Sequence, residues 1–210
     1  MKDQNIEDEL VSIRSLMERS SKFISLSGLS GIMAGVYALI GAAIAYHIVY
    51  SSTGWFTSRD VVVDNITAHM ETIVHLLLVA IAVLIAAMAT GIFLSVKKAK
   101  RKSQSIWSST TRSLLFNSAI PLATGGLFML IMLSRGYYGV VAPASLIFYG
   151  LAVISGSHYT FTDVKYLGIL QIILGLIAAL YPGYGLIFWA LGFGVLHIIY
   201  GSIMYFKYDR

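Results

Sequence analysis

Two groups of polar residues could do chemistry in this chain, and the first combines histidines with carboxylates. His47 is followed by Asp64, His69, Glu71 and His75, and long apolar segments lie on either side of them. Glu71 and His75 are four positions apart, so they would share one face of a helix. Imidazole and carboxylate groups together can bind Zn²⁺ or a similar divalent ion, or can titrate as a proton-sensing pair. We expect such a site to use His47, Glu71 and His75.

The second group consists of uncharged hydrogen-bonding residues inside apolar sequence. Asn117, Gln171 and His197 each lie within a long apolar segment, at a similar distance from its basic end. Three such side chains at one level could line a polar pocket, or they could join helices by hydrogen bonds. Further candidates for the same pocket are Tyr37, Tyr200 and His158.

The residue types exclude several other chemistries. The chain contains no cysteine, which excludes a disulfide framework, a thiolate metal site and a cysteine nucleophile. It also lacks a phosphate-binding loop, a recognisable nucleophile elbow and a pair of acids inside an apolar segment. We therefore expect no enzyme activity and no resident cofactor, with Zn²⁺ at the histidine and carboxylate group as the one exception.

The composition indicates how these residues are held. Hydrophobic residue types make up 57% of the 210 residues and charged types only 12%, whereas an ordinary soluble domain has about 25% charged residues. About 20 apolar helical residues cross the hydrocarbon of a bilayer. Six segments qualify, and they run over approximately 23–49, 72–96, 113–133, 140–157, 164–181 and 184–206. The sequence predicts an all-α, polytopic membrane protein with six transmembrane helices.

Glycine and proline mark the two shortest connections between these segments. The third and fourth segments are separated by 135–139, and the fifth and sixth by Pro182 and Gly183. Such residues terminate helices, and the neighbouring tyrosines suit the membrane interface. Both connections are predicted to be tight hairpins.

The histidine and carboxylate group has an alternative interpretation. His47 and His69 could be interfacial side chains that bind no ligand, with Glu71 acting as a helix cap or as a local partner.

Basic residues predict the orientation, because Lys and Arg near span ends remain preferentially in the cytoplasm. With both chain ends inside, only Arg59 and Arg135 of the 15 basic residues lie outside. The densest basic run follows the second segment, where such runs act as topology anchors that contact anionic lipid head groups rather than nucleic acid. Its members are Lys97, Lys98, Lys100, Arg101 and Lys102.

The two ends of the chain, both predicted to be cytoplasmic, are predicted to differ in structure. Residues 1–22 carry Ile6, Leu10, Ile13 and Met17 at helical spacing, which is typical of an amphipathic helix. This helix would lie on the membrane surface or against the bundle. Residues 207–210 are predicted to form a short cytoplasmic tail.

Small residues in the first segment predict close helix packing. Gly31, Gly35 and Ala38 belong to two rows of small side chains along one side of the helix, and such rows let membrane helices approach closely. The neighbouring helix could belong to the same chain or to a second copy in a homo-oligomer.

Two stretches carry a resemblance to known proteins. The sequence from Met17 to Gly31 and the closing stretch from Tyr181 to Lys207 resemble an uncharacterised family of small bacterial six-helix inner-membrane proteins. The hairpin from Gly168 to Gly201 is also similar to the HdeD-type membrane proteins. The first resemblance implies a bacterial inner membrane and assigns no activity or functional residue.

Two functions fit these expectations. The protein could be a small transporter or channel for a neutral or lipophilic solute, since the predicted spans contain almost no charge to couple to an ion. Alternatively, it could be a non-transporting scaffold, sensor or stress-response protein that acts through lipid or protein partners.

Overall fold

The computed structural model describes residues 27–50, 66–101 and 106–209, where all regular structure is helical and no strand occurs. Its separate helices are α2 (Gly28–Tyr50), α3 (Ile66–Arg101), α4 (Ser109–Ser134), α5 (Val141–Ser157) and α6 (Val164–Leu180), with a short 3₁₀ turn, η1 (Tyr138–Val140), before α5. The last helix is continuous over 25 residues, Gly185–Asp209. It consists of α7 (Gly185–Trp189), the π-helical η2 (Ala190–Leu196), α8 (His197–Met204) and the π-helical η3 (Tyr205–Asp209).

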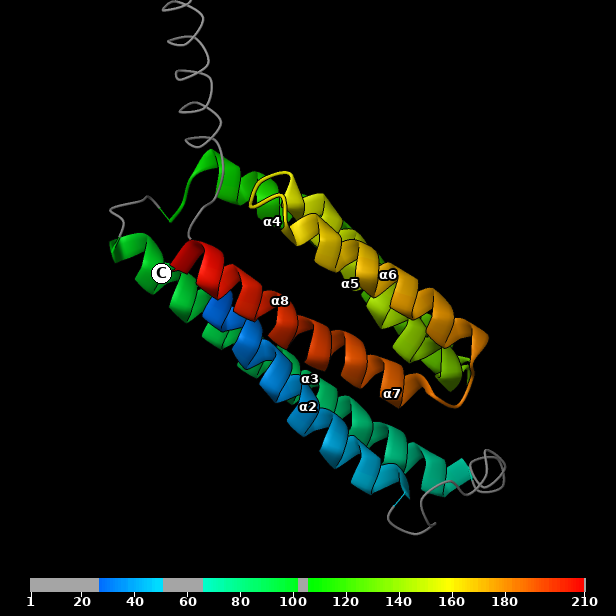
Figure 1. The fold of residues 1–210 in the computed structure, drawn as a ribbon. Helices are drawn as coiled ribbons and strands as arrows, with labels where there is room; N and C mark the ends of the chain where they lie inside the picture. The colour runs from blue at the N-terminus through cyan, green and yellow to red at the C-terminus, as the bar shows by residue number, and fades with distance from the viewer. Residues whose placement is uncertain (1–26, 51–65, 102–105, 210) are drawn as a thin grey trace, which may run out of the picture.

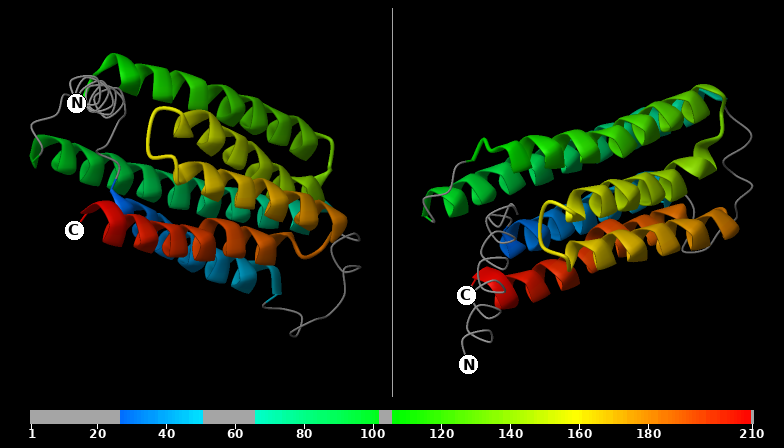
Figure 2. Two further views of the ribbon diagram at one scale, coloured as in Figure 1. Left: turned by 45° about the horizontal axis from the view of Figure 1, so that its top comes forward. Right: turned by 90° about the horizontal axis from the view of Figure 1, so that it is seen from above.

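These helices form two layers (Figure 1). In the first layer, α2 packs between α3 and the last helix, and in the second layer α5 packs between α4 and α6. The two further views of Figure 2 show the same layers from other directions. The layers meet where α5 and α6 contact α7 and η2. Any polar residue at that contact is enclosed by both layers.

The predicted all-helical class is confirmed, and the apolar helices fit a membrane-embedded protein. Within the described residues, five helices are long and apolar enough to cross a membrane, while α6 is apolar but has only 17 residues. The outer faces of α3 and α4 expose large side chains such as Ile85, Phe93, Phe116 and Leu127. Hydrocarbon can surround these faces because the helices satisfy their own backbone hydrogen bonds.

Each of the six predicted segments coincides with a helix, but several ends differ. The second segment was placed at 72–96, whereas α3 extends from Ile66 to Arg101 because its polar ends remain helical. Lys207 to Asp209, which are predicted to begin a short tail, continue the last helix. Contacts of these side chains, described below, hold this final turn. The predicted helix at 1–22 lies outside the described residues.

Two glycines make the tight connections that the sequence predicts. Gly136 has φ 83° directly after α4, and Gly183 has φ 95° before the last helix. Such positive φ angles are accessible to glycine without the steric penalty that a Cβ brings. Both glycines therefore allow the chain to reverse within a few residues.

Glycine also brings α2 against the last helix. A Cβ added at Gly31 would lie 3.1 Å from the Cα of Gly201, and one at Gly35 would lie 2.6 Å from the carbonyl oxygen of Gly194. Ala38, in the second row of small residues, is also buried. These contacts support the intrachain alternative for Gly31 and Gly35, and they fix α2 and the last helix as one unit.

Candidate functional site

Buried polar residues gather where the two layers meet. Gln171 of α6 and His197 of the last helix have relative exposures of 0% and 6%. The Gln171 Nε2 donates a hydrogen bond to the carbonyl oxygen of Gly192 at 2.8 Å, and His197 Nδ1 lies 3.0 Å from the same oxygen. A carbonyl oxygen only accepts hydrogen bonds, so His197 Nδ1 must carry the proton and donate.

This proton assignment determines the partner of the other ring nitrogen. The hydroxyl oxygen of Tyr149, on α5, lies 2.7 Å from His197 Nε2. In a neutral imidazole with a proton on Nδ1, Nε2 is an acceptor, so Tyr149 donates to it. Gln171 Nε2 and His197 Nδ1 are 3.4 Å apart, but both donate to Gly192 and do not bond each other. We call Tyr149, Gln171, Gly192 and His197 the interlayer cluster.

The glycine in this cluster makes room for the amide that reaches it. A Cβ at Gly192 would lie 2.3 Å from Leu146 Cδ2 and 2.7 Å from Gln171 Oε1. Gly192 also lies within the π-helical segment η2, and π-helical turns are rare and occur often at functional positions. The absence of a side chain at Gly192 thus lets α6 approach closely enough for Gln171 to bond the backbone.

Aromatic rings surround the histidine. Trp189, Phe193 and His197 follow one another at four-residue spacing along the last helix. The Phe193 ring is stacked on His197 with centroids 5.9 Å apart, and the Tyr149 and Trp189 rings each lie 5.1 Å from Phe193. Offset and tilted aromatic contacts of this kind are favourable beyond the area they bury. The hydrogen bonds of His197 are therefore enclosed by apolar rings.

The chemistry available to the interlayer cluster is that of neutral hydrogen bonding. Its four residues include no carboxylate and no ammonium group. In the described part of the chain, Gln171 Oε1 and Tyr200 Oη are buried without a hydrogen-bond partner, as is Thr160 Oγ1. The arrangement can join helices and orient a neutral group, but it offers no paired acid and base for catalysis.

The structure brings together only part of the predicted inner layer. Gln171 and His197 do meet, whereas the Asn117 amide nitrogen donates to Ser113 O at 2.8 Å and to Tyr159 Oη at 3.1 Å. Asn117 therefore joins α4 to the end of α5. Asn117 thus lies apart from Gln171 and His197, in a hydrogen bond of its own between helices.

The other residues predicted to line the pocket lie at separate positions. The Tyr37 hydroxyl lies 3.2 Å from Thr90 Oγ1 and connects α2 to α3. Tyr200 lies one turn beyond His197, and His158 is exposed after α5. Tyr149 was not predicted, and its only sequence signal is a hydroxyl nine residues inside an apolar segment.

The predicted outer metal group is dispersed in the described residues. His47 is exposed on α2, and His75 Nδ1 lies 2.7 Å from the backbone oxygen of Glu71. Among the described residues, no three His, Cys, Asp or Glu side chains are close enough to hold a metal ion. Asp64 and the side chain of His69 lie outside the described part. Zn²⁺ binding stays a prediction.

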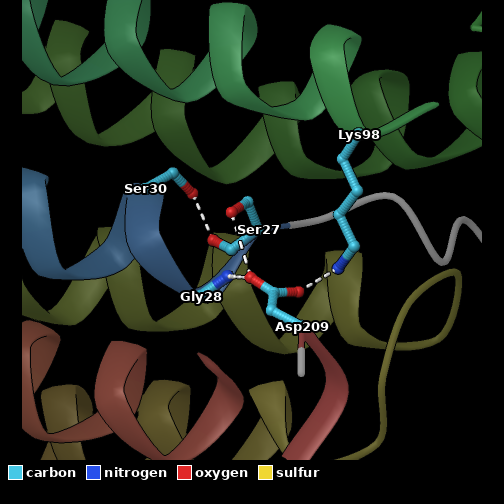
Figure 3. A network of polar contacts seen from close by, with 5 residues as sticks. All are labelled: Ser27, Gly28, Ser30, Lys98 and Asp209. Atoms are coloured by element: carbon cyan, nitrogen blue, oxygen red, sulfur yellow. Dashed lines mark hydrogen bonds and ion pairs between the residues drawn. The ribbon is translucent and has the colours of Figure 1, made fainter. Parts of the chain in front are cut away.

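One lysine of the predicted lipid anchor is paired within the protein (Figure 3). Lys98 forms an ion pair with Asp209, whose other carboxylate oxygen accepts hydrogen bonds from the Gly28 backbone nitrogen at 2.8 Å and from Ser27 Oγ at 3.1 Å. The Gly28 nitrogen is one of the donors that the start of a helix leaves unpaired, and a negative charge there is favourable. Asp209 thus caps α2.

The rest of the basic run retains its predicted surface position. Lys97, Lys100 and Arg101 are exposed at the end of α3. Lys102 lies outside the described residues. Contact of the exposed bases with anionic lipid head groups stays a prediction.

A second carboxylate, Asp163, binds the same end of the last helix. Asp163 Oδ2 accepts hydrogen bonds from Lys207 Nζ at 2.6 Å and from Tyr208 Oη at 2.9 Å. The hydrogen bond from Lys207 is the largest cause that lowers the pKa of Asp163 below its ordinary value; burial opposes it, and the Tyr208 hydrogen bond adds to the lowering. The folded protein therefore favours the ionised carboxylate.

This pKa shift predicts an acid-dependent loss of stability that Asp163→Asn removes. A carboxyl group with a lowered pKa in the folded state stabilises fully above its unfolded pKa of about 4, and the effect disappears as pH falls through the folded value. We expect wild type to exceed Asp163→Asn in thermal midpoint at pH 6, and the difference to shrink toward zero below about pH 4. Parallel midpoint curves from pH 6 to pH 3 would contradict the assignment.

The fold and its buried cluster together define an all-α protein of the membrane-embedded class. No protein-family model, curated protein or solved structure matches the chain. The resemblance to small bacterial inner-membrane proteins consequently stays a prediction, and the function has to be argued from the geometry of this chain.

Proposed function

We propose that the protein is a six-span scaffold or sensor of the bacterial inner membrane that transports no solute and acts through lipid or protein partners. The observation that carries this proposal is the use of the deep polar side chains. The Gln171 amide nitrogen bonds the last helix, the Tyr149 hydroxyl bonds His197 across the two layers, and Gln171 and His197 are buried. A carrier needs comparable groups facing a substrate path.

The positions of the start of α2 and the end of the last helix support an even number of spans, and therefore six. The Gly28 nitrogen and the Asp209 carboxylate are 2.8 Å apart, so α2 begins on the side where the last helix ends. An even number of crossings is required between them, whereas five helices in the described part of the chain reach full length. With 17 residues, α6 rises about 25 Å and would supply the sixth crossing of a hydrocarbon layer about 30 Å thick.

The distribution of bases supports cytoplasmic ends. Lys98 and Lys207 pair with carboxylates at the end of the bundle where α2 begins, and the exposed bases Lys97, Lys100 and Arg101 follow the same end of α3. Basic residues at span ends favour the cytoplasm. The same exposed bases would contact anionic head groups, whereas their position beside a spanning helix disfavours nucleic acid.

One observation favours the second candidate, a carrier for a lipophilic solute. A groove of about 260 Å³ lies between α6 and the last helix. It is lined only by apolar side chains, which are Leu170, Ile173, Leu174, Ile177, Leu191, Val195 and Leu196. An apolar molecule retained in native mass spectra of wild type and lost in Leu174→Trp would favour this function.

Cysteine labelling tests the proposal, because the chain has no cysteine of its own. We expect single cysteines at Gln171 and Leu146, both fully buried, to react with a membrane-impermeant maleimide at least about tenfold more slowly than one at exposed Tyr181. The closely packed interior excludes the reagent from both positions. Labelling of Gln171→Cys or Leu146→Cys at a rate near that of Tyr181→Cys would overturn the proposal in favour of an aqueous path.

The same reagent tests the orientation. In intact cells, Tyr181→Cys should be labelled, and Lys100→Cys should react only after the membrane is permeabilised. The opposite pattern would place the basic end of the bundle outside the cell.

A further inference from the structure

The final turn of the last helix contacts both layers. Lys207 and Tyr208 donate hydrogen bonds to Asp163, which immediately precedes α6 in the second layer. The next residue, Asp209, binds Gly28 and Lys98 in the first layer. Consecutive side chains of η3 thus bind opposite layers.

Aromatic contacts reinforce this connection. The ring of Phe161, in the connection between α5 and α6, is stacked on Tyr208 with centroids 4.1 Å apart. Lys98 Nζ lies 5.8 Å from the centroid of the same ring. Phe161 of the second layer is therefore in contact with groups from both α3 and the last helix.

The two halves of this connection differ in exposure. The side chains of Lys207 and Asp163 are 53% and 27% exposed, whereas those of Lys98 and Asp209 are 12% and 9% exposed. Exposed ion pairs contribute little stability and are screened by salt, while partly buried pairs are screened much less. The ion pair of Lys207 with Asp163 is therefore weaker and more sensitive to salt than that of Lys98 with Asp209.

The rest of the last helix cannot leave the first layer as easily. A Cβ at Gly201 would lie 2.5 Å from the backbone nitrogen of Ile32 and 2.8 Å from the carbonyl oxygen of Gly28. This backbone contact holds the last helix to α2 over several turns. Loss of the bonds to Asp163 would accordingly leave the last helix on α2 and leave the Phe161 contacts to hold the second layer at this end, so the layers separate there more often.

We propose that η3 is a releasable strap that closes the two layers at the end holding Asp163 and Asp209. The strap opens at Asp163, and Asp209 keeps it attached to α2 and α3. The interlayer cluster stays formed during opening and acts as the pivot. This conformational device goes beyond the proposed scaffold function.

Distance measurements between spin labels test the strap in the full-length protein in nanodiscs of neutral lipid. Single cysteines replace Tyr166 of α6 and Ile203 of α8, which are exposed on opposite layers near the strap. A control pair replaces Ile177 of α6 and Ile187 of α7, which are exposed near the opposite end. Wild type should give one narrow distance distribution for each pair in about 0.1 M salt.

Asp163→Asn should raise the long-distance fraction of the strap pair about two- to fivefold, as expected for loss of an exposed ion pair, and leave the control pair unchanged. Salt at about 0.5 M should produce the same change in wild type but add nothing to the variant. Asp209→Asn is the matched control, because it removes a carboxylate from the same turn while Asp163 still binds it, so the strap pair should stay short.

Three outcomes would overturn the proposal. The first is an Asp163→Asn distribution equal to that of wild type, which would mean that the strap closes nothing. The second is equal opening by Asp209→Asn, which would remove the distinction between the two halves. The third is a longer distance in the control pair as well, which would indicate general loosening of the bundle rather than opening at one end.

Discussion

Replacing Gly201 by alanine is expected to destabilise the protein severely. The new Cβ would lie 2.5 Å from the Ile32 nitrogen, 2.8 Å from the Gly28 oxygen and 2.9 Å from the Gly31 carbonyl carbon. All three are backbone atoms, so no side chain can rotate away and α2 must separate from the last helix. Overpacking of this kind costs about 3 kcal/mol, which corresponds to a drop in thermal midpoint on the order of 10 °C. Fluorescence-detected size exclusion after heating measures this thermal midpoint.

Two other glycines provide controls for the same substitution. A Cβ at Gly91 of α3 meets no atom within 4 Å, and alanine favours a helix over glycine by about 1 kcal/mol. Gly91→Ala should therefore keep or slightly raise the midpoint. Gly31→Ala, whose Cβ would lie 3.1 Å from the Gly201 Cα, should fall between the two. A Gly201→Ala midpoint equal to that of Gly91→Ala would refute the close backbone contact.

The helices and the hairpins could be predicted because the bilayer sets a length scale that composition reveals. Apolar runs of about 20 residues locate helices without any knowledge of their neighbours. Gly136 and Gly183 mark the reversals, since positive φ angles favour glycine. The helix ends were less predictable, because polar residues after an apolar run can continue the backbone hydrogen bonds, as those before Arg101 do in α3.

The partners of the polar residues could not be predicted, because they depend on which faces meet. The depths of Asn117 and Gln171 in their segments are similar, yet Asn117 faces Tyr159 and Gln171 faces the last helix. The role of Tyr149 could not be predicted either, since a tyrosine in an apolar segment is often a membrane-interface or packing residue. Asp209 binds Gly28 across 181 positions of sequence. No local pattern encodes such a contact.

His197→Ala is expected to be the most damaging substitution in the interlayer cluster. It removes the bond to the Gly192 carbonyl, the acceptor for Tyr149 and the ring stacked on Phe193. A buried cavity and an unpaired hydroxyl together cost about 2–4 kcal/mol. His158→Ala is the matched control, because His158 is exposed, and it should leave the thermal midpoint unchanged.

A second substitution separates the hydrogen bond from the packing. Tyr149→Phe alone should destabilise wild type by about 1 kcal/mol, since it leaves His197 Nε2 without its donor at 2.7 Å. In the His197→Ala background the same change should stabilise, because it removes a buried hydroxyl that has lost its acceptor. The sign of the Tyr149→Phe effect thus reverses between the two backgrounds, as measured by thermal midpoints of all four proteins. Equal effects in both backgrounds would show that Tyr149 and His197 act independently, and the tautomer assigned to His197 would then have no support.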